Sequence, residues 1–248
     1  MAPSERSAAA ARRLLPLIDL TSLNESDDDA AIARLIARAW TPFGHVAAVC
    51  VWPKFIAAAR KALRGHRVPI AVVVNFPLGT GTVEAVTLET ADAIAAGADE
   101  IDVVFPFRAF LEGDRCLGPD LLAACRKACV GHVMKVILET GQLESVEAIG
   151  AAARMAVASG ADFLKTSTGK IQPGATLKSA AVLMDVIAQA RADGKTVGLK
   201  ASGGIRRMEE ALAYLNLFED RLGAGSARAD CFRIGASSLI DEVLANIS

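Results

Sequence analysis

The sequence predicts one α/β domain with the architecture of a (β/α)8 barrel, also called a TIM barrel. Its 248 residues lie within the range that such barrels occupy as a single domain. Short runs rich in β-branched residues recur along the chain, and each is followed by a longer, alanine-rich segment with helical periodicity. This alternation is typical of repeated βα units around a parallel sheet, and no linker-like stretch divides the chain.

Eight short apolar runs are expected to form the strands. The run at 70–74 reads IAVVV and lacks polar alternation, as expected of a parallel strand that is buried on both faces. The predicted strands are residues 15–20, 46–51, 70–75, 100–104, 133–138, 162–166, 196–201 and 230–235.

Eight longer segments are expected to form the helices. Ser26 can cap the acidic start of the first helix, Pro53 suits a first turn, and Gly97 and Gly160 follow apolar faces as C-terminal stops. The predicted helices are residues 27–40, 53–63, 83–96, 118–130, 143–159, 177–192, 207–218 and 238–246. We expect residues 1–13 to form an N-terminal arm, frayed or helical, and residues 14–248 to form the barrel domain.

An open, doubly wound sheet could use the same eight units, so the first strand–helix turn is informative. A dinucleotide-binding sheet would place a GxGxxG motif there, whereas this chain reads DLTSLN at 19–24. A nicotinamide cofactor is therefore disfavoured, and we favour the closed barrel.

Composition narrows the classes of partner. The 27 Lys and Arg residues balance 28 Asp and Glu, so no field of one sign favours nucleic acid or an anionic membrane. The sequence has no apolar run long enough to span a bilayer. The five cysteines and three histidines show no metal-ligand spacing, and the odd cysteine count fits a reducing compartment. We expect a cytoplasmic protein without a metal or organic cofactor that acts on a small molecule.

Four charged residues stand inside predicted strands, where apolar residues are expected. They are Asp102, Lys135, Lys165 and Lys200, in the fourth to seventh strands. A single lysine there could simply extend to solvent from the strand end, because lysine is rarely buried without a partner. Four charges in successive strands instead indicate a catalytic cluster, since the carboxyl ends of barrel strands share one mouth.

Clustering would change the chemistry of these lysines. Two ammonium groups ~4 Å apart at an effective dielectric constant near 20 repel by about 4 kcal/mol, or roughly 3 pKa units. Together with desolvation, this repulsion can leave one amine neutral near pH 7, as attack on a carbonyl requires. The sequence therefore predicts Schiff-base chemistry.

Three predicted loops carry donors for an anion. Gly169 and Lys170 follow the sixth strand, Gly203 and Gly204 follow the seventh, and a serine pair, Ser237 and Ser238, follows the eighth. Each feature alone could be a tight turn or a helix cap, but barrels commonly bind phosphate after their last strands. Together they predict a phosphate site.

Seven segments spread over nearly the whole chain resemble the deoxyribose-phosphate aldolases, a class I family. These segments are DLT at 19–21, VNFPLG at 74–79, EIDVV at 100–104, KVILET at 135–140, FLKTSTG at 163–169, KASGGIR at 200–206 and RIGASS at 233–238. The resemblance implies cleavage of 2-deoxy-D-ribose 5-phosphate to D-glyceraldehyde 3-phosphate and acetaldehyde. It also implies a barrel fold and no cofactor.

The resemblance also implies roles for individual residues. Lys165 resembles the Schiff-base nucleophile, Asp102 and Lys200 the proton relay, and Lys135 a polar neighbour of that relay. The phosphate contacts implied by the family fall on Gly169, Lys170, Gly203, Gly204, Ser237 and Ser238, and the residues lining the mouth on Asp19, Thr21 and Cys50. For Cys50 a core position is the alternative, because cysteine in an apolar strand is usually buried packing.

Some members of this family carry a terminal tyrosine that assists proton transfer, whereas this sequence ends NIS at 246–248 and has one tyrosine, Tyr214. Either such a tail is missing, or proton exchange depends on water and the Asp102–Lys200 pair. Two alternatives remain open: another Schiff-base phosphosugar aldolase or transaldolase, and a phosphosugar-binding barrel without catalysis. We expect a homodimer, the commonest symmetric assembly.

Overall fold

The parallel strands close into the predicted barrel in a computed structural model that describes residues 5–247. Around the barrel the strand order is β1-β10-β9-β8-β7-β6-β5-β4, and every neighbouring pair is parallel. The barrel strands are β1 (Ile18–Thr21), β4 (Ala48–Val51), β5 (Ile70–Val74), β6 (Glu100–Val104), β7 (Val133–Ile137), β8 (Phe163–Lys165), β9 (Gly198–Ser202) and β10 (Phe232–Ala236). This topology is the (β/α)8 fold that the sequence predicts.

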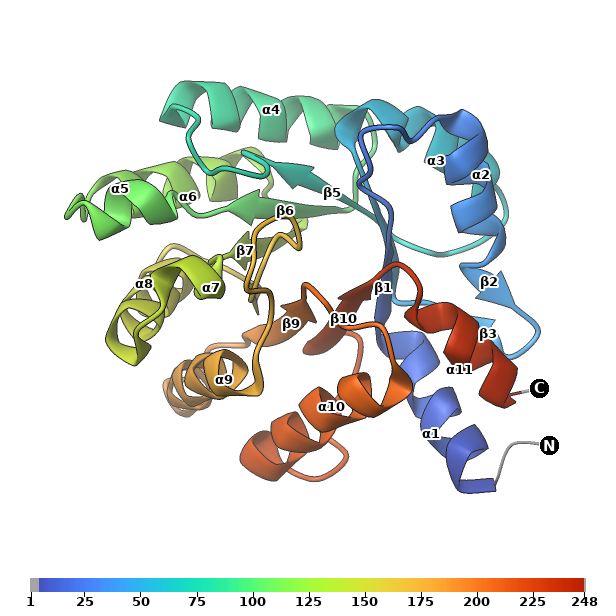
Figure 1. The fold of residues 1–248 in the computed structure, drawn as a ribbon. Helices are drawn as coiled ribbons and strands as arrows, with labels where there is room; N and C mark the ends of the chain where they lie inside the picture. The colour runs from blue at the N-terminus through green and yellow to red at the C-terminus, as the bar shows by residue number, and fades with distance from the viewer. Residues whose placement is uncertain (1–4, 248) are drawn as a thin grey trace.

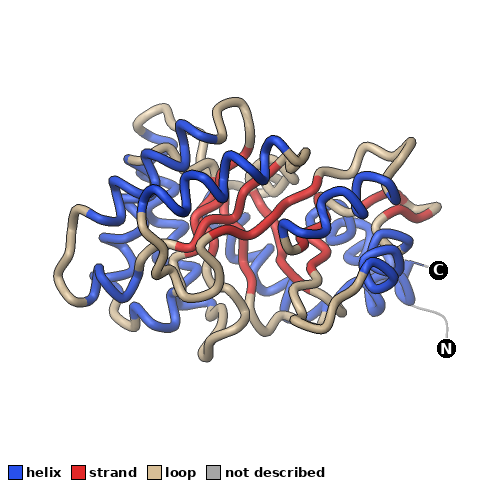
Figure 2. Tube along the Cα trace, turned by 90° about the horizontal axis from the view of Figure 1, so that it is seen from above, coloured by secondary structure: helices blue, strands red, loops and turns tan. Residues whose placement is uncertain are grey.

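Helices surround the strands, so the strands lie at the centre of the molecule in both ribbon and tube views (Figures 1 and 2). The longer ones are α2 (Asp29–Ala37), α3 (Ile56–Ala62), α4 (Val83–Ala95), α6 (Leu117–Ala128), α8 (Val146–Ala158), α9 (Leu177–Ala192), α10 (Met208–Leu222) and α11 (Leu239–Ile247). Their buried faces pack against the outward-facing side chains of the strands and form the main hydrophobic core.

Several short elements interrupt the predicted pattern. Residues Leu15–Leu17 form a 3-10 helix, so β1 begins three residues later than predicted, because Pro16 lies in this segment. Two short helices, α5 (Phe107–Leu111) and α7 (Thr140–Leu143), and a hairpin of β2 (Trp40–Thr41) and β3 (Gly44–His45) were not predicted. The cap of α2 is Asp28, whose carboxylate accepts from Ala31 N, and not Ser26.

The N-terminal segment is helical and docks onto the barrel. Helix α1 (Glu5–Leu14) packs against α10 and α11, with Ala11 and Leu14 buried and an ion pair between Arg13 and Glu219. The first four residues of the predicted arm, and Ser248, lie outside the described residues. No helix of residues 5–247 is long and apolar enough to cross a membrane.

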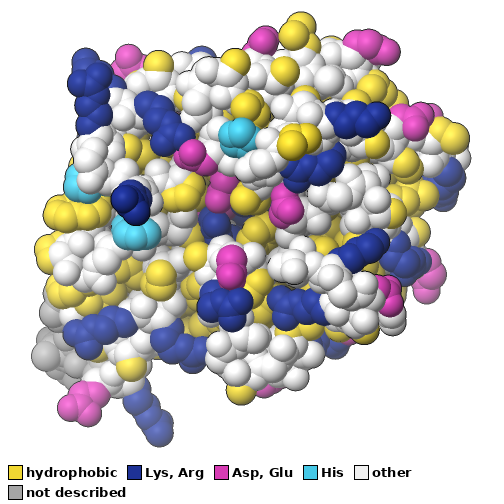
Figure 3. Space-filling view, turned by 180° about the vertical axis from the view of Figure 1, so that it is seen from behind, with side chains coloured by type: hydrophobic (Ala, Val, Ile, Leu, Met, Phe, Trp, Pro, Cys, Tyr) yellow, Lys and Arg dark blue, Asp and Glu magenta, His cyan; other side chains and the backbone are white. Residues whose placement is uncertain are grey.

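The barrel interior has two chemically different sides. Inward side chains of β4 and β5, namely Ala48, Cys50, Ala71 and Val73, form a small apolar cluster with Leu23. The inward positions of β6 to β10 hold most of the buried charges. On the outer face in Figure 3, acidic and basic side chains are interspersed. The charges that the fold concentrates are therefore internal.

Candidate active site

The strand register brings the four predicted charges to the inner face of the barrel. Asp102 on β6 pairs with Lys135 on β7, and Lys165 on β8 pairs with Lys200 on β9. Paired residues of parallel strands point to the same side of a sheet, and Ile137 links the two pairs by standing opposite Lys165. All four side chains consequently enter one interior.

The three amino groups converge on one carboxylate. Lys165 Nζ and Lys200 Nζ each lie 2.7 Å from Asp102 Oδ2, and Lys135 Nζ lies 2.7 Å from Asp102 Oδ1. Lys200 also contacts Asp19 Oδ2 at 2.6 Å. All of these side chains are buried, so the contacts act in an environment from which bulk water is excluded.

The lysines differ in protonation chemistry. Burial lowers the pKa of Lys165, and although Asp102 opposes this effect, the neighbouring charge of Lys200 adds to it. Burial would also lower the pKa of Lys200, but there Asp102 and Asp19 outweigh it, so that pKa is raised. Lys165 is thus the amine that most readily becomes neutral and nucleophilic.

Asp102 remains ionised in this cluster. Burial alone would raise its pKa, but Lys135, Lys165 and Lys200 hold the pKa well below its usual range. The carboxylate therefore keeps its negative charge and can orient an ammonium group or a water molecule during a reaction. The thiol of Cys50, 4.0 Å from Asp102 Oδ2, has a pKa raised by burial and stays protonated.

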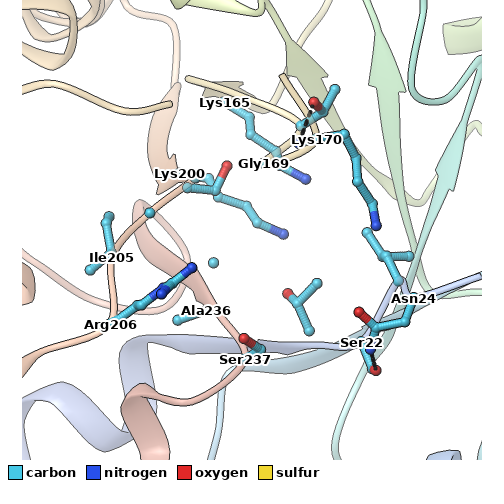
Figure 4. Close-up of a pocket in the computed structure, with 17 residues that line it drawn as sticks. Ser22, Asn24, Lys165, Gly169, Lys170, Lys200, Ile205, Arg206, Ala236 and Ser237 are labelled. Carbon is cyan, nitrogen blue, oxygen red and sulfur yellow. Dashed lines mark hydrogen bonds between the residues drawn. The ribbon is translucent and has the colours of Figure 1, made fainter. Parts of the chain in front are cut away.

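A pocket of about 220 Å³ opens above the cluster at the carboxyl ends of the strands. Lys165 and Lys200 point into it, and Lys170 and Arg206 stand at its rim (Figure 4). The lining residues are Thr21, Ser22, Leu23, Asn24, Lys165, Thr168, Gly169, Lys170, Lys200, Ser202, Gly203, Gly204, Ile205, Arg206, Gly235, Ala236 and Ser237. Besides Lys165, the lining has three cationic side chains, Lys170, Lys200 and Arg206, and no carboxylate, so it favours an anionic ligand.

The rim loops contain glycines in conformations that other residues rarely adopt. Gly169, Gly203 and Gly204 have positive φ values of 77°, 98° and 92°, a backbone conformation that strains other residues. A side chain on Gly203 would also come within 3.1 Å of Ser167 Cβ. Such glycine-rich turns let amide groups approach a phosphate, and Ser237 adds a hydroxyl just before α11.

A sequence profile of the DeoC/LacD family aldolases matches residues 13–239. The chain belongs to this aldolase family. Its fold resembles a Toxoplasma gondii ME49 structure with a TM-score of 0.89 at 26% identity, covering 98% of this chain and 95% of that one. For a Coccidioides immitis structure the TM-score is 0.80 at 30% identity, covering 98% and 88%. Both of these are provisionally named deoxyribose-phosphate aldolases.

A third structure differs in its described assembly. The deoxyribose phosphate aldolase from Aeropyrum pernix, described as a unique tetramer, matches with a TM-score of 0.75 at 25% identity. The match covers 98% of this chain and 97% of that one. The likeness thus extends over the whole barrel.

In this aldolase the remaining predicted site residues occupy different depths. Thr21 lines the pocket, and its hydroxyl donates to the backbone oxygen of Asp19 at 2.9 Å. Asp19, Cys50 and Lys135 are fully buried and are absent from the pocket lining. They lie deeper in the barrel, in or beside the cluster and out of reach of the pocket surface. Ser238 is exposed directly before α11 and does not line the pocket.

Some residues of the site were not predicted from the sequence. Ser22 and Asn24 line the pocket immediately after β1, and Arg206 extends the seventh-strand loop. Each of these residues follows the end of a strand that carries a predicted site residue, so its position in the sequence could have indicated it. Glu139 is less obvious: it is buried at the end of β7 and accepts from the Thr168 hydroxyl at 2.5 Å.

Among the described residues, no group of three or more Cys, His, Asp or Glu could hold a metal ion. Tyr214 lies on α10 with its ring packed in the core between helices and the barrel, and burial raises its pKa to about 12. It is absent from the pocket lining, so the candidate proton carriers there are the cluster residues and water.

Proposed function

We propose that this aldolase reversibly cleaves 2-deoxy-D-ribose 5-phosphate to D-glyceraldehyde 3-phosphate and acetaldehyde through a Schiff base on Lys165. The observation that carries the proposal is one buried amine with a lowered pKa, placed in a pocket whose rim is cationic. The amine suits an aldehyde and the rim suits a phosphate. The two ends of one phosphosugar would thus be recognised by different parts of the same pocket.

In the first half of the mechanism, the neutral Lys165 amine attacks C1 of the open-chain aldehyde. The carbinolamine takes up a proton at its hydroxyl and loses water to give an iminium ion, which accepts the electron pair of the C2–C3 bond as that bond breaks. The C3 hydroxyl gives its proton to a base, and the carbonyl of glyceraldehyde 3-phosphate forms. Asp102, ionised and 2.7 Å from both Lys165 and Lys200, is the base, acting through Lys200 and a water molecule.

In the second half, the enamine that remains on Lys165 is protonated at C2. Lys200 is the proton source, since Asp102 and Asp19 keep it in its ammonium form at neutral pH. Water then hydrolyses the iminium ion, releasing acetaldehyde and the free amine. Substituting Lys200→Leu should remove the relay and lower kcat by at least a hundredfold, and turnover at the native rate would contradict the relay.

Reductive trapping tests the central step. Sodium borohydride added with 2-deoxyribose 5-phosphate should fix a two-carbon or five-carbon adduct on Lys165, located by peptide mass spectrometry. Lys165→Met should lose both the adduct and turnover. The matched control Lys127→Met, at an exposed lysine on α6, should keep both. An adduct on another lysine, or none at all, would contradict the assignment.

A substrate panel separates the alternatives. Trapping with other sugar phosphates but not with 2-deoxyribose 5-phosphate would indicate a different Schiff-base aldolase or a transaldolase. Binding of the phosphosugar without any adduct would indicate a non-catalytic barrel. The lowered pKa of Lys165 argues against the last case, because a binding pocket alone would have no use for a neutral amine.

We further propose that the protein is cytoplasmic and forms a homodimer. The free cysteines Cys50, Cys125, Cys129 and Cys231 are buried as thiols, which suits a reducing compartment. Sedimentation equilibrium should give twice the mass of one chain. A concentration-independent monomer would contradict the dimer, and a fourfold mass would match the assembly described for the Aeropyrum pernix protein.

A further inference from the structure

Two charged residues deep in the barrel have no part in the reaction proposed above. Glu100 on β6 and Arg233 on β10 are 3% and 5% exposed and lie two residues before Asp102 and Gly235, on the same inner face. Arg233 lies over the ring of Phe163, its Cζ atom 5.6 Å from the ring centroid. Burying two such charges is unfavourable unless they are paired, so their contacts are informative.

Glu100 and Arg233 form ion pairs with each other and with residues of the lysine–aspartate cluster, and these pairs close into a ring. Arg233 Nη2 lies 3.1 Å from Glu100 Oε1, and Arg233 Nη1 lies 2.5 Å from Asp19 Oδ1. Lys135 Nζ lies 2.6 Å from Glu100 Oε2. With the contacts already described, these pairs form the charge ring Asp102–Lys135–Glu100–Arg233–Asp19–Lys200 and back to Asp102.

The signs in the charge ring alternate, so three carboxylates match three cations. Lys165 stands outside the ring, and its only ion pair among the described residues is with Asp102 Oδ2, an oxygen already bound by Lys200. A proton on Lys165 would leave the buried cluster with a net positive charge. A neutral Lys165 leaves it balanced.

We propose that Glu100 and Arg233 are positioning residues that close the charge ring and thereby make Lys165 the lysine that gives up its proton. The raised pKa values of Lys135 and Lys200 and the lowered pKa of Lys165 agree with this division. Two other ionisable groups act on Lys165: the Cys50 thiol and the Glu139 carboxyl, both with pKa values raised by burial. Neither forms an ion pair with Lys165 among the described residues, whereas each cation of the ring contacts at least two carboxylates.

The functional meaning of this inference rests on the proposed role of Lys165, but protonation can be measured without turnover. In protein labelled with 13C at lysine Cε, NMR titration follows each buried amine, and Lys→Met variants assign the signals. In the wild-type protein Lys165 should titrate at lower pH than both Lys135 and Lys200. A different order would overturn the proposal even if every ring variant failed to fold.

Substitutions of Glu100 and Arg233 should shift the titration midpoint of Lys165 in opposite directions, and the two shifts should cancel in the double variant. Arg233→Met leaves the ring with a negative charge and should raise the Lys165 midpoint by about one pH unit, and Glu100→Gln should lower it by a similar amount. The double variant restores neutrality and should return the midpoint to the wild-type value, as should the conservative Arg233→Lys. Loss of packing alone would not produce shifts of opposite sign that cancel.

The control is Arg60→Met, which removes an exposed ion pair with Asp99 and should leave the midpoint unchanged. Shifts of the same sign in the two single variants, or no shift in either, would overturn the proposal. If the shifts occur as stated but borohydride never labels Lys165, the proposed function fails while the role of the charge ring stands.

Discussion

Lys165 and Lys200 bear the same amino group and contact the same carboxylate oxygen, yet only Lys165 has a lowered pKa. The difference is the second partner: Lys200 also contacts Asp19, whereas among residues 5–247 Lys165 has no other carboxylate within ion-pair distance. A second counter-ion about 3 Å away in a buried site is enough to reverse the direction of a pKa shift. The pKa of a buried lysine in this cluster therefore depends on how many carboxylates contact it.

A second residue-scale feature holds the rim of the pocket in shape. Glu139 adopts a left-handed conformation with φ of 54° and accepts from the Thr168 hydroxyl, which in turn accepts from Lys170 N at 3.0 Å. Such a conformation is unfavourable for a residue with a side chain and persists because surrounding contacts hold it, the bond to Thr168 among them. This chain of bonds fixes the turn that presents Gly169.

Substituting Thr168→Val should loosen the rim without touching the lysine cluster. Loss of a buried hydrogen bond to a carboxylate costs about 1–2 kcal/mol, so KM for the phosphosugar should rise roughly tenfold while kcat changes little. Steady-state kinetics at several substrate concentrations measure both. A Thr168→Ser variant keeps the hydroxyl and is the matched control, and a fall in kcat with unchanged KM would contradict this role.

At the scale of elements, strand β10 leaves room for the Lys200 side chain because it has a glycine, Gly235, beside it. Gly235 faces the interior, where an added Cβ atom would lie 3.1 Å from Lys200 Cε and 2.8 Å from Ser202 Cβ. Neither neighbour is free to retreat, because Lys200 is held by two carboxylates and Ser202 Oγ donates to Ser167 O at 2.6 Å. The absence of a side chain at Gly235 is therefore required by the position of Lys200.

Gly235→Ala should displace Lys200 from Asp102 and lower kcat by at least tenfold, since a small displacement of a reacting group is costly. Gly150→Ala on α8 is the control: its added Cβ atom would meet mainly the end of the Arg154 side chain, at 3.1 Å. That change should stabilise the helix by about 0.5–1 kcal/mol and leave kcat unchanged. Urea unfolding and steady-state kinetics measure the two effects, and full activity in Gly235→Ala would contradict the argument.

At the scale of the whole molecule, the fold combines an apolar outer core with a charged interior. The main core lies between the strands and the helices, and the ionic cluster lies inside the barrel, where every member has a partner. Breaking such a buried pair is strongly destabilising because the remaining charge is left without compensation. Stability should consequently depend on the ionisation of the interior carboxylates.

The pKa values of Asp19 and Asp102 are lowered in the folded protein, relative to about 3.9 in the unfolded chain. Both carboxylates therefore contribute stability above pH 4 that is lost as the pH falls below the unfolded value, by up to about 2.7 kcal/mol per pH unit for two protons. Urea unfolding between pH 6 and pH 3 should show this decline.

The double variant Asp19→Asn/Arg233→Met removes one carboxylate together with one of its partners. It should weaken the acid dependence by about one proton, or roughly 1.4 kcal/mol per pH unit. A free energy of unfolding that stays constant down to pH 3 in the wild-type protein would contradict the linkage.

Much of the barrel was predictable because strand and helix periods are local properties of sequence. The predicted strand at 100–104 coincides with β6, and each of the other predicted strands overlaps an observed one. The alternation of side chains also places Glu100 and Asp102 on one face, so Glu100 could have been found by counting two residues back. The short helix α5 and the β2–β3 hairpin were missed because segments of two to five residues carry little periodic signal.

By itself, the sequence determined the βα order, the family resemblance and the four charges that stand in strands. It could not determine which carboxylate serves which amine, because that depends on register across strands distant in the chain: Asp19 and Arg233, 214 residues apart, form one ion pair. Only closure of the barrel made the charge ring complete and left Lys165 outside it. Burial then lowers the pKa of Lys165 relative to those of Lys135 and Lys200, since a charge without a matching partner is far less stable away from water.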